Sequence, residues 1–279
     1  MSERAYSIEC NKEISAKEAS ELSRRGDLSD SKGFHCSDPD CAIDLTCTNW
    51  NKRGKKYYFT PSSKDELHIV GCSQISVSEA REQSHREAQG AKKTIKKNGV
   101  IKMTKSNNRA RTNIGATSVP TTSGSGNSSS GLNASTKTKK EYRHMYSIAS
   151  FVDLFSDNDV DNNSQFVSID GNTLSLNTLF VPTTSKSFTW GVNRIFYGEA
   201  LLKSSLKNNG MLEIEFRDCI FPKVYSNISM LSKRSVTSNI LNFLDKNVYA
   251  TVYVRGKLID SGKTLKSFND KVYKDLLFR

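Results

Sequence analysis

Four residues of the metal-binding type constrain the fold of this chain most: Cys36, Cys41, His68 and Cys72. The first two flank Ser-Asp-Pro-Asp, whose composition favours a tight turn with both sulfurs on one side. The other two lie in the run His68-Ile-Val-Gly-Cys72, a spacing that fits the first turn of a helix. Zinc prefers four such ligands in a tetrahedron, and a Cys3His set is a common structural solution. These residues therefore predict a small zinc-stapled module in the N-terminal third.

The ligand set predicts a structural Zn2+ ion rather than a catalytic one. A catalytic zinc keeps one coordination position open and usually has a Glu base nearby. Glu66 is close in the sequence, but four ligands leave no open position. His35, beside Cys36, would point to the opposite side of a strand. Cys47 is near enough in the sequence to replace one of the four ligands, and the sequence alone does not decide between them.

Nothing in the sequence predicts secretion or a membrane partner. The first seven residues contain no apolar run of the kind found in signal peptides. No stretch approaches the ~18 consecutive apolar residues of a membrane span. We therefore expect a cytoplasmic protein, in which clustered cysteines more often bind metal than form disulfides.

The net charge of +12 comes almost wholly from the middle of the chain. Residues 1–90 carry −2, residues 91–140 carry +11 without any acidic residue, and residues 141–279 carry +3. The middle segment also contains the Ser/Gly-rich run 121–131, which predicts a disordered linker. Flexible Lys and Arg residues neutralise phosphates and release counterions, which gives salt-sensitive binding to nucleic acid. The alternative for this segment is a solubilising spacer.

The predicted fold class is α+β, in three parts: a zinc module with flanking helices (1–100), the disordered basic linker (101–141) and an OB-like β-barrel (142–279). One helix is expected over 13–25, with Ser15 as N-cap and Gly26 as stop. A second is expected over 79–97, capped by Ser76 or Ser78. A knuckle and hairpin are expected over 33–59.

The C-terminal part alternates apolar and polar residues in the manner of strands. Strands are expected over 165–169, 174–180, 195–202, 211–216, 249–258 and 272–278, with a short one near 223–225 and a helix over 235–244. From residue 195 this gives five strands with one helix between the third and the fourth, which is the element order of an OB-fold. A generic small β-barrel or sandwich is the alternative.

The N-terminal motif resembles a known family. The run Phe34-x-Cys36-x4-Cys41, followed by Tyr58-Phe59 and His68-x3-Cys72, is similar to the zinc-finger-type N-terminal domain of competence CoiA-like proteins. The resemblance covers about residues 15–72. It implies a bacterial DNA-associated protein of a DNA-uptake, mobile-element or defence system. A nuclease-like domain often follows in that family, and nothing matching it is visible in this sequence.

Two sets of residues outside the metal site are candidates for binding nucleic acid. The cations of the middle region and the end of the second helix would contact phosphates; they are Lys92, Lys93, Lys96, Lys97, Lys105, Arg109, Arg111, Lys137, Lys139 and Lys140. On the barrel, stacking and charge would come from Phe196, Tyr197, Tyr253 and Lys257. The alternative for the strand aromatics is packing within the core or across strands.

We therefore expect a non-enzymatic protein that binds nucleic acid, with single-stranded DNA favoured. The first alternative is an adaptor that docks protein partners on the zinc module and the barrel. A nuclease is a further alternative, in which Glu213, Glu215 and Asp218 would hold a metal. The alternation of Glu213 and Glu215 with apolar residues is, however, typical of a solvated strand face. No small-molecule substrate is evident from the sequence.

Overall fold

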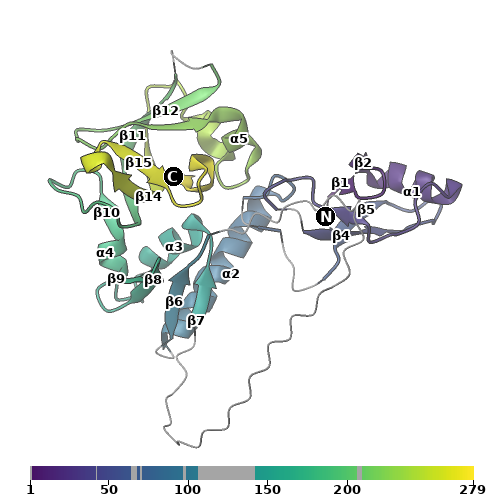
Figure 1. The fold of residues 1–279 in the computed structure, drawn as a ribbon, viewed down its shortest axis with the longest axis horizontal. Helices are drawn as coiled ribbons and strands as arrows, with labels where there is room; N and C mark the ends of the chain where they lie inside the picture. Colours follow the sequence, from purple (N-terminus) through teal and green to yellow (C-terminus); the bar gives the residue numbers. More distant parts are fainter. Residues whose placement is uncertain are drawn as a thin grey trace, which may run out of the picture.

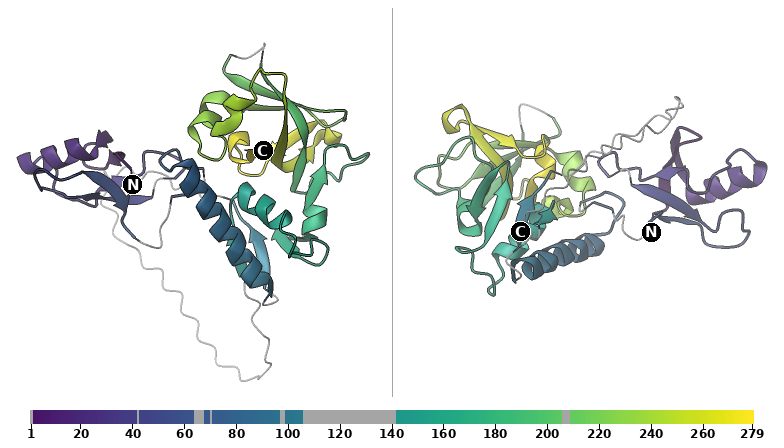
Figure 2. Two further views of the ribbon diagram at one scale, coloured as in Figure 1. Left: turned by 180° about the vertical axis from the view of Figure 1, so that it is seen from behind. Right: turned by 60° about the horizontal axis from the view of Figure 1, so that its bottom comes forward.

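The computed structural model describes residues 2–41, 43–63, 68–69, 71–96, 99–105, 142–205 and 209–279. Three β-sheets follow one another along the chain, and the hydrophobic core of the middle sheet also contains Ile195 and Leu277 of the C-terminal sheet. Figures 1 and 2 show the N-terminal module at one end and the C-terminal barrel at the other, with α2 (Val77–Lys96) leading from the first to a small sheet beside the second. The α+β class is confirmed.

The N-terminal module is a five-stranded sheet in the order β2-β1-β3-β4-β5 with one helix packed on it. Its elements are β1 (Arg4–Ser7), β2 (Lys12–Ser15), α1 (Ala16–Arg25), β3 (Phe34–His35), β4 (Asp44–Thr48) and β5 (Tyr58–Pro61). The expected caps of α1 are confirmed, because Ser15 accepts from Glu18 N and Gly26 ends the helix at φ 84°. The expected start at residue 13 was wrong: residues 13 and 14 belong to β2, which pairs with β1.

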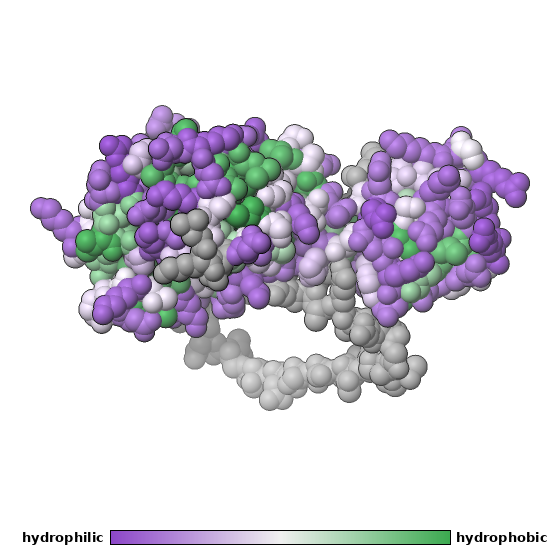
Figure 3. Space-filling view, turned by 90° about the horizontal axis from the view of Figure 1, so that it is seen from above, coloured by the Kyte–Doolittle hydropathy of each residue, from purple (hydrophilic) through white to green (hydrophobic). Residues whose placement is uncertain are grey.

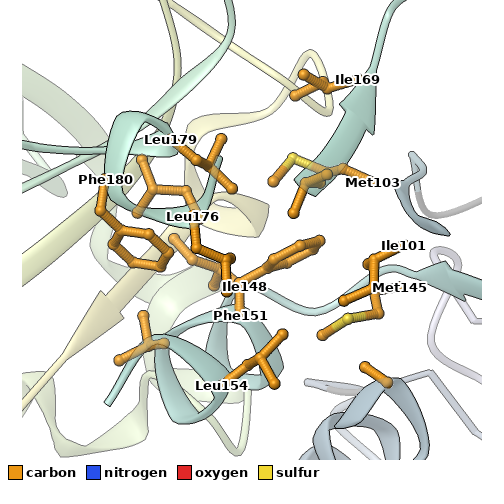
Figure 4. Packing of buried hydrophobic residues seen from close by; sticks show 14 of the residues in the cluster. Ile101, Met103, Met145, Ile148, Phe151, Leu154, Ile169, Leu176, Leu179 and Phe180 are labelled. Carbon is orange, nitrogen blue, oxygen red and sulfur yellow. The ribbon is translucent and has the colours of Figure 1, made fainter. Parts of the chain in front are cut away.

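A four-stranded sheet in the order β7-β6-β8-β9 lies between the module and the barrel. Its elements are β6 (Val100–Met103), β7 (Tyr142–Met145), α3 (Ile148–Phe155), β8 (Phe166–Ile169), β9 (Asn172–Ser175) and α4 (Leu176–Leu179). Figure 4 shows Ile101, Met103 and Met145 of the sheet facing Ile148 and Phe151 of α3 in one core. α2 packs on α3, and Ser76 is its cap, one of the two candidates expected. Ser76 and Glu79 each accept from the other's backbone N–H, which makes this a capping box.

The structure corrects the expected division of the chain. The boundary at residue 100 separates α2 from β6, although Ala91 of α2 and Ile101 of β6 lie in the same core as residues of β7 and α3. β6, expected to be part of the linker, forms a parallel pair with β7. Residues 106–141, the rest of the predicted linker, lie outside the described residues. The sequence did not reveal the β6–β7 pair, because parallel pairing joins two four-residue strands that are far apart in the chain.

The C-terminal sheet has the order β13-β12-β11-β14-β15, with β10 on β11 and β16 on β14. Its elements are β10 (Phe180–Pro182), β11 (Arg194–Ser204), β12 (Met211–Phe216), β13 (Val224–Asn227), α5 (Ile228–Lys233), η1 (Ser238–Asn242), β14 (Tyr249–Ile259), η2 (Asp260–Gly262), β15 (Thr264–Ser267), η3 (Val272–Lys274) and β16 (Leu276–Phe278). Counted from β11, this is the order 3-2-1-4-5. Because η3 also packs against β13, the sheet is nearly closed, as in an OB-like barrel.

Three elements of the C-terminal part differ from expectation. The strand expected over 174–180 is interrupted by α4, because the Ser175 side chain caps a helical turn by accepting from Thr178 N. The helix expected over 235–244 is instead α5, capped by Asn227 and ended at Arg234, followed by the 3-10 turn η1. The strand expected over 272–278 is divided into η3 and β16, and β15 was not anticipated.

Candidate metal centre and nucleic-acid interface

The four expected metal ligands come together at one point of the N-terminal module. Cys36 and Cys41 flank the turn between β3 and β4, where Cys41 N donates to Asp38 O at 3.0 Å. His68 and Cys72 come from the loop before α2, where Cys72 N donates to Ile69 O at 3.0 Å. The ligand atoms of all four residues lie within 4.8 Å of one another.

The spacing of these atoms fits a tetrahedral zinc ion. Cys36 Sγ lies 3.5 Å from Cys72 Sγ, and His68 Nδ1 lies 3.5 Å from Cys41 Sγ and 3.4 Å from Cys72 Sγ. Ligands bound at about 2.0–2.3 Å and separated by tetrahedral angles would be about 3.6–3.8 Å apart. These three separations are close to the tetrahedral values, and no two of the four ligand atoms are more than 4.8 Å apart. The three buried sulfurs and one imidazole nitrogen are therefore a suitable donor set for zinc.

Hydrogen bonds around the ligands hold the two loops in register. The buried carboxylate of Asp38 accepts from Ser73 N at 2.7 Å and from Asp40 N at 2.9 Å, so it joins the knuckle to the loop that carries Cys72. Gln74 N donates to Cys72 Sγ at 3.3 Å. Such outer partners orient ligands and tune a bound metal. Asp38 has this position because it lies between the two cysteines of the turn.

Hydrogen bonds join the three thiols of the cluster. Those from Cys36 and Cys72 strongly lower the pKa of Cys41. The hydrogen bond with Cys41 raises the pKa of Cys36, and those with Cys36 and Cys41 raise the pKa of Cys72, with burial adding to both shifts. A metal ion must displace these protons, because zinc binds thiolates. The bound ion would supply rigidity by joining the two loops.

Cys47, the alternative ligand, lies outside the cluster. Its sulfur approaches the carbonyl oxygens of Ala16 at 3.8 Å and Thr48 at 3.9 Å, on the side of the sheet that packs against α1. Burial raises the pKa of Cys47 to about 11, as expected for a thiol of the hydrophobic core. His35 is also not among the grouped ligands, and its Nδ1 lies 2.9 Å from Asp44 Oδ1.

The knuckle also forms the contact between the N-terminal module and the barrel. Asp40 accepts from Lys274 Nζ at 2.8 Å and from the Tyr273 hydroxyl at 3.0 Å, both on η3. Arg234, at the end of α5, lies 3.9 Å from the same carboxylate. Burial lowers the pKa of Arg234, and burial together with Asp40 raises the pKa of Tyr273 to about 12. The turn that carries two metal ligands thus supplies the counter-ion of two buried barrel cations.

Gly71 allows this close approach. It lies beside the ligand Cys72 with φ 87°, and a Cβ at this position would be 2.5 Å from Nη2 of Arg234 and 3.0 Å from a methyl group of Val236. A residue with a side chain would be disfavoured both by the left-handed backbone and by the barrel. The role of Gly71 and Asp40 could not be inferred from spacing, because their partners are about 160–230 residues away in the chain.

The aromatic residues expected to stack on bases do not form an exposed face. Phe196 is 1% exposed and belongs to the barrel core. Tyr197 and Tyr253 stack on each other with ring centroids 5.8 Å apart and pack against the core beneath α3. The alternation of these strands predicts an outer face open to solvent, whereas the four-stranded sheet unit covers it. The expectation for these three residues is corrected accordingly.

The predicted cations have different environments. Lys92 is bound to Asp157 and Asp159, both at 2.8 Å, and the hydrogen bond to Asp157 raises the pKa of Lys92. Lys105 pairs with Asp270 at 3.2 Å. Lys93 and Lys96 are exposed on α2. The remaining predicted cations lie outside the described residues; they are Lys97, Arg109, Arg111, Lys137, Lys139 and Lys140.

The β14–β15 hairpin presents a more concentrated set of free cations. Lys257 pairs directly with Lys266 across the two strands, and Lys263 is exposed at the turn. None of the three has an ion-pair partner among the described residues. Like charges directly opposite each other destabilise a sheet unless an anion lies between them. In an OB-like barrel this hairpin connects strands 4 and 5, one of the two loops with which that fold binds oligonucleotides.

Trp190 lies beside this hairpin and is 57% exposed. Its Nε1 is 3.4 Å from the position that a Cβ of Gly262 would occupy, and Gly191 N donates to Leu258 O at 2.9 Å, which ties its loop to β14. An exposed indole next to unpaired lysines combines the two elements of a single-strand binding surface. Among Trp190, Lys257, Lys263 and Lys266, only Lys257 was predicted from the sequence. The presence of lysines on both sides of the turn at Asp260 was the sequence signal that could have indicated the others.

The acidic residues considered as ligands of a nuclease metal are all ion-paired with Lys or Arg. Glu213 accepts from Lys223 at 2.7 Å, and Glu215 accepts from Lys203 at 2.9 Å. Asp218 pairs with Arg217 at 3.1 Å. Ion-paired carboxylates on a solvated strand face are a poor site for a catalytic metal.

No helix within the described ranges is both long enough and apolar enough to cross a membrane. No known protein family, curated protein or solved structure matches this chain.

Proposed function

We propose that the protein binds single-stranded nucleic acid through the β14–β15 hairpin, with the zinc ion in a structural role. The observation that carries this proposal is the cross-strand pair of Lys257 and Lys266, which have no acidic partner among the described residues, together with the exposed ring of Trp190 beside their hairpin. Lysines would contact phosphates, and the indole would stack on a base. Asp260 is the acidic residue of the turn, so the hairpin remains positive.

The basic segment 91–140 supports the same proposal by its composition. Its net charge of +11 would add affinity that depends on salt but not on sequence. This segment and the hairpin would have separable effects, because charge acts on all phosphates whereas stacking requires an unpaired base. Preference for single strands over duplex is therefore assigned to Trp190.

Fluorescence anisotropy with a labelled oligothymidine and with a duplex of equal length tests this function at two salt concentrations. We expect Trp190→Ala to weaken single-strand binding by about 1–3 kcal/mol, the usual contribution of one stacked base. Lys257→Ala with Lys266→Ala should also weaken binding, and should lower the salt dependence by about 0.7 for each phosphate that is no longer neutralised. Lys203→Ala is the matched control, because Lys203 is ion-paired with Glu215 and lies on β11, outside the hairpin. Absence of binding by the wild-type protein at low salt would refute the proposal.

Exposed apolar residues favour a protein-interaction adaptor as the second candidate. Ile220, Leu241 and Val248 of the barrel are 79%, 54% and 50% exposed. Figure 3 shows hydrophobic residues gathering on the larger body, whereas the N-terminal module is largely hydrophilic in that view. An adaptor would lose its partner on Ile220→Lys or Leu241→Lys while nucleic-acid binding stays unchanged. Loss of both activities together would contradict separate surfaces.

The biological setting remains a prediction. The resemblance of residues 15–72 to CoiA-like proteins supports a bacterial protein of DNA uptake, a mobile element or defence. A cytoplasmic location would agree with reduced thiols at the metal site.

A further inference from the structure

A small pocket of about 260 Å³ lies between α4, β10, the loop 183–193 and the first residues of β11. Figure 1 shows α4 leading into β10 beside the barrel. Among the described residues, no Asp or Glu lines the pocket; its polar lining residues are Asn177, Thr178, Ser187, Thr189 and Arg194. Its volume is below the roughly 300–1,000 Å³ of pockets for drug-sized molecules. The pocket therefore has room for a small group rather than for a whole cofactor.

Arg194 brings a positive charge to this pocket without a counter-ion. The residue is 8% exposed, and its Nη1 donates to Thr178 O. None of the ion pairs in the described parts of the chain includes Arg194, and its cross-strand neighbour on β14 is Gly256. Nε and Nη2 of Arg194 have no hydrogen-bond partner among the described residues, and neither is a fully enclosed atom, so both retain accessible surface. Buried charges are normally paired, so this guanidinium indicates an anionic ligand.

The two other buried Arg residues of the described chain have carboxylate partners. Arg255 donates to Asp275 at 2.8 Å, and Arg234 lies 3.9 Å from Asp40. Burial lowers the pKa of Arg194, which means that its charged form is less favourable here than in water. An anion in the pocket would offset this cost in the way that Asp275 does for Arg255.

The remaining free groups of the pocket are donors that suit phosphate. Ser187 and Thr189 are exposed, and neither hydroxyl has a hydrogen-bond partner among the described residues. Together with the fork of Arg194, they offer several donors to one anion. A guanidinium matches phosphate geometry with two parallel hydrogen bonds, and a phosphate monoester still has a third terminal oxygen for the hydroxyl groups.

The pocket also lies next to the stacking residue of the proposed nucleic-acid surface. Thr189 lines the pocket, and the next residue is Trp190, whose ring lies beside Gly262 of the β14–β15 turn. A nucleotide whose base stacks on Trp190 would therefore have its phosphate group close to the pocket. An internal phosphate of a strand has a sugar on both sides, whereas a terminal phosphate has a sugar on one side only and can enter a small pocket.

We propose that this pocket binds a phosphate monoester, with its terminal oxygens at Arg194, Ser187 and Thr189. The phosphate is either the terminal phosphate of a strand that stacks on Trp190 or the phosphate of a small free ester. The first source rests on the proposed single-strand binding, and the second does not.

Fluorescence anisotropy of the full chain with three oligothymidines distinguishes these sources: one with a 5′-phosphate, one with a 3′-phosphate and one with neither. We expect one phosphorylated strand to bind about 10-fold more tightly than the unphosphorylated strand, as for one charge-assisted hydrogen-bonded group. Calorimetric titration with phenyl phosphate tests the small ester, with an expected Kd below ~1 mM. Benzoate, which has the same ring but a carboxylate, should bind at least about 5-fold more weakly.

The outcomes separate this proposal from the proposed function. Equal affinity for the three strands together with no binding of phenyl phosphate would overturn the pocket and leave single-strand binding intact. Absence of binding by all three strands would refute single-strand binding, whereas phenyl phosphate would still support or overturn the pocket. Equal affinity for the strands with binding of phenyl phosphate identifies a small ester as the ligand. Equal binding of benzoate and phenyl phosphate would refute the assignment to phosphate.

A pair of variants in one loop locates the binding. Ser187→Asp places a carboxylate beside Arg194, so it should remove the preference for the phosphorylated strand and weaken phenyl phosphate at least about 10-fold. Thr184→Asp is the matched control, because Thr184 is exposed in the same loop but does not line the pocket. It adds the same charge and should leave the ratio of the two strand affinities unchanged. Equal effects of the two variants would refute the assignment.

Replacing Arg194 by Met distinguishes a ligand-binding role from a structural one. Arg194→Met should abolish the preference for the phosphorylated strand. Because it removes a buried charge that has no partner, it should leave the urea midpoint of the phosphate-free protein unchanged or raise it. A lower midpoint with unchanged phosphate binding would show that Arg194 only supports the fold.

Discussion

Replacing Asp40 by Asn should destabilise the barrel, although Asp40 belongs to the turn between Cys36 and Cys41 of the N-terminal module. Asp40 is the acceptor for Lys274 and Tyr273 and lies close to Arg234. The side chain of Lys274 is 2% exposed and that of Asp40 is 13% exposed, so the pair is shielded from water. Removing one partner of a buried pair costs roughly 3–5 kcal/mol, because the other charge stays buried without compensation. Asn retains an oxygen that can accept from Tyr273, so we expect the lower value, about 3 kcal/mol.

Thermal and urea unfolding of the zinc-loaded protein would measure this effect. For a unit of about 150–250 residues, 1 kcal/mol shifts Tm by roughly 2–4 °C, so the expected decrease is about 6–12 °C. A chain with several cores need not unfold in one step. The two tryptophans separate the steps, because Trp50 packs near Phe34 in the N-terminal module and Trp190 lies on the barrel. The unfolding transition reported by Trp190 fluorescence should shift to a lower temperature in the Asp40→Asn variant.

Two further variants make the reasoning refutable. Asp218→Asn removes a carboxylate that is 83% exposed in its pair with Arg217, so it should change stability by no more than about 0.5 kcal/mol. Adding Lys274→Met to Asp40→Asn should restore most of the stability, because the buried ammonium group that pairs with Asp40 is then gone as well. Equal effects of Asp40→Asn and Asp218→Asn, or strict additivity in the double variant, would show that Asp40 and Lys274 are not paired in solution.

Three other predictions follow from single side chains. Cys36→Ser should reduce bound zinc from one per chain to near zero, whereas Cys47→Ser should leave it unchanged, as measured by elemental analysis. Gly71→Ala should lower the free energy of unfolding in urea more than Gly26→Ala, by about 1–3 kcal/mol, because both have positive φ but only Gly71 faces the barrel. Burial raises the pKa of Glu87, so its favourable contribution is complete below the ordinary carboxyl pKa and is lost as the pH rises through the raised value. Glu87→Gln should therefore flatten the dependence of the urea midpoint on pH above about pH 4.

Features that depend on neighbours in the chain could be predicted from the sequence. The four metal ligands form two close pairs in the sequence. Cys47 remained an alternative ligand until the structure placed it on β4 against α1, outside the cluster. Ser15 caps its helix through contacts within three residues. The same holds for the capping box at Ser76. Such contacts are determined by local backbone geometry and need no knowledge of the rest of the fold.

Features that depend on distant neighbours could not be predicted in this way. β6 and β7 are short; they pair with each other, β6 also pairs with β8, and all three strands share one core with α3. Tyr197 and Tyr253 have the alternating pattern of an exposed strand face, but a second unit covers that face. Periodicity shows that a strand has two faces, and it does not show which of them another unit covers. We therefore propose that nucleic acid binds at Trp190 and the β14–β15 hairpin, and not at these two tyrosines.

The position of Asp40 connects the metal centre to the barrel through a short stretch of chain. η3, which carries Tyr273 and Lys274, follows β15 after four residues and leads directly into β16. Loss of zinc would free the knuckle and, with it, the counter-ion of Lys274, so it should loosen η3 and the adjoining β15. Asp40→Asn removes that counter-ion while all four metal ligands remain. If zinc acts on the barrel through this carboxylate, amide exchange in residues 264–278 should increase by a similar factor after chelation and after the substitution, whereas exchange in α1 should increase only after chelation.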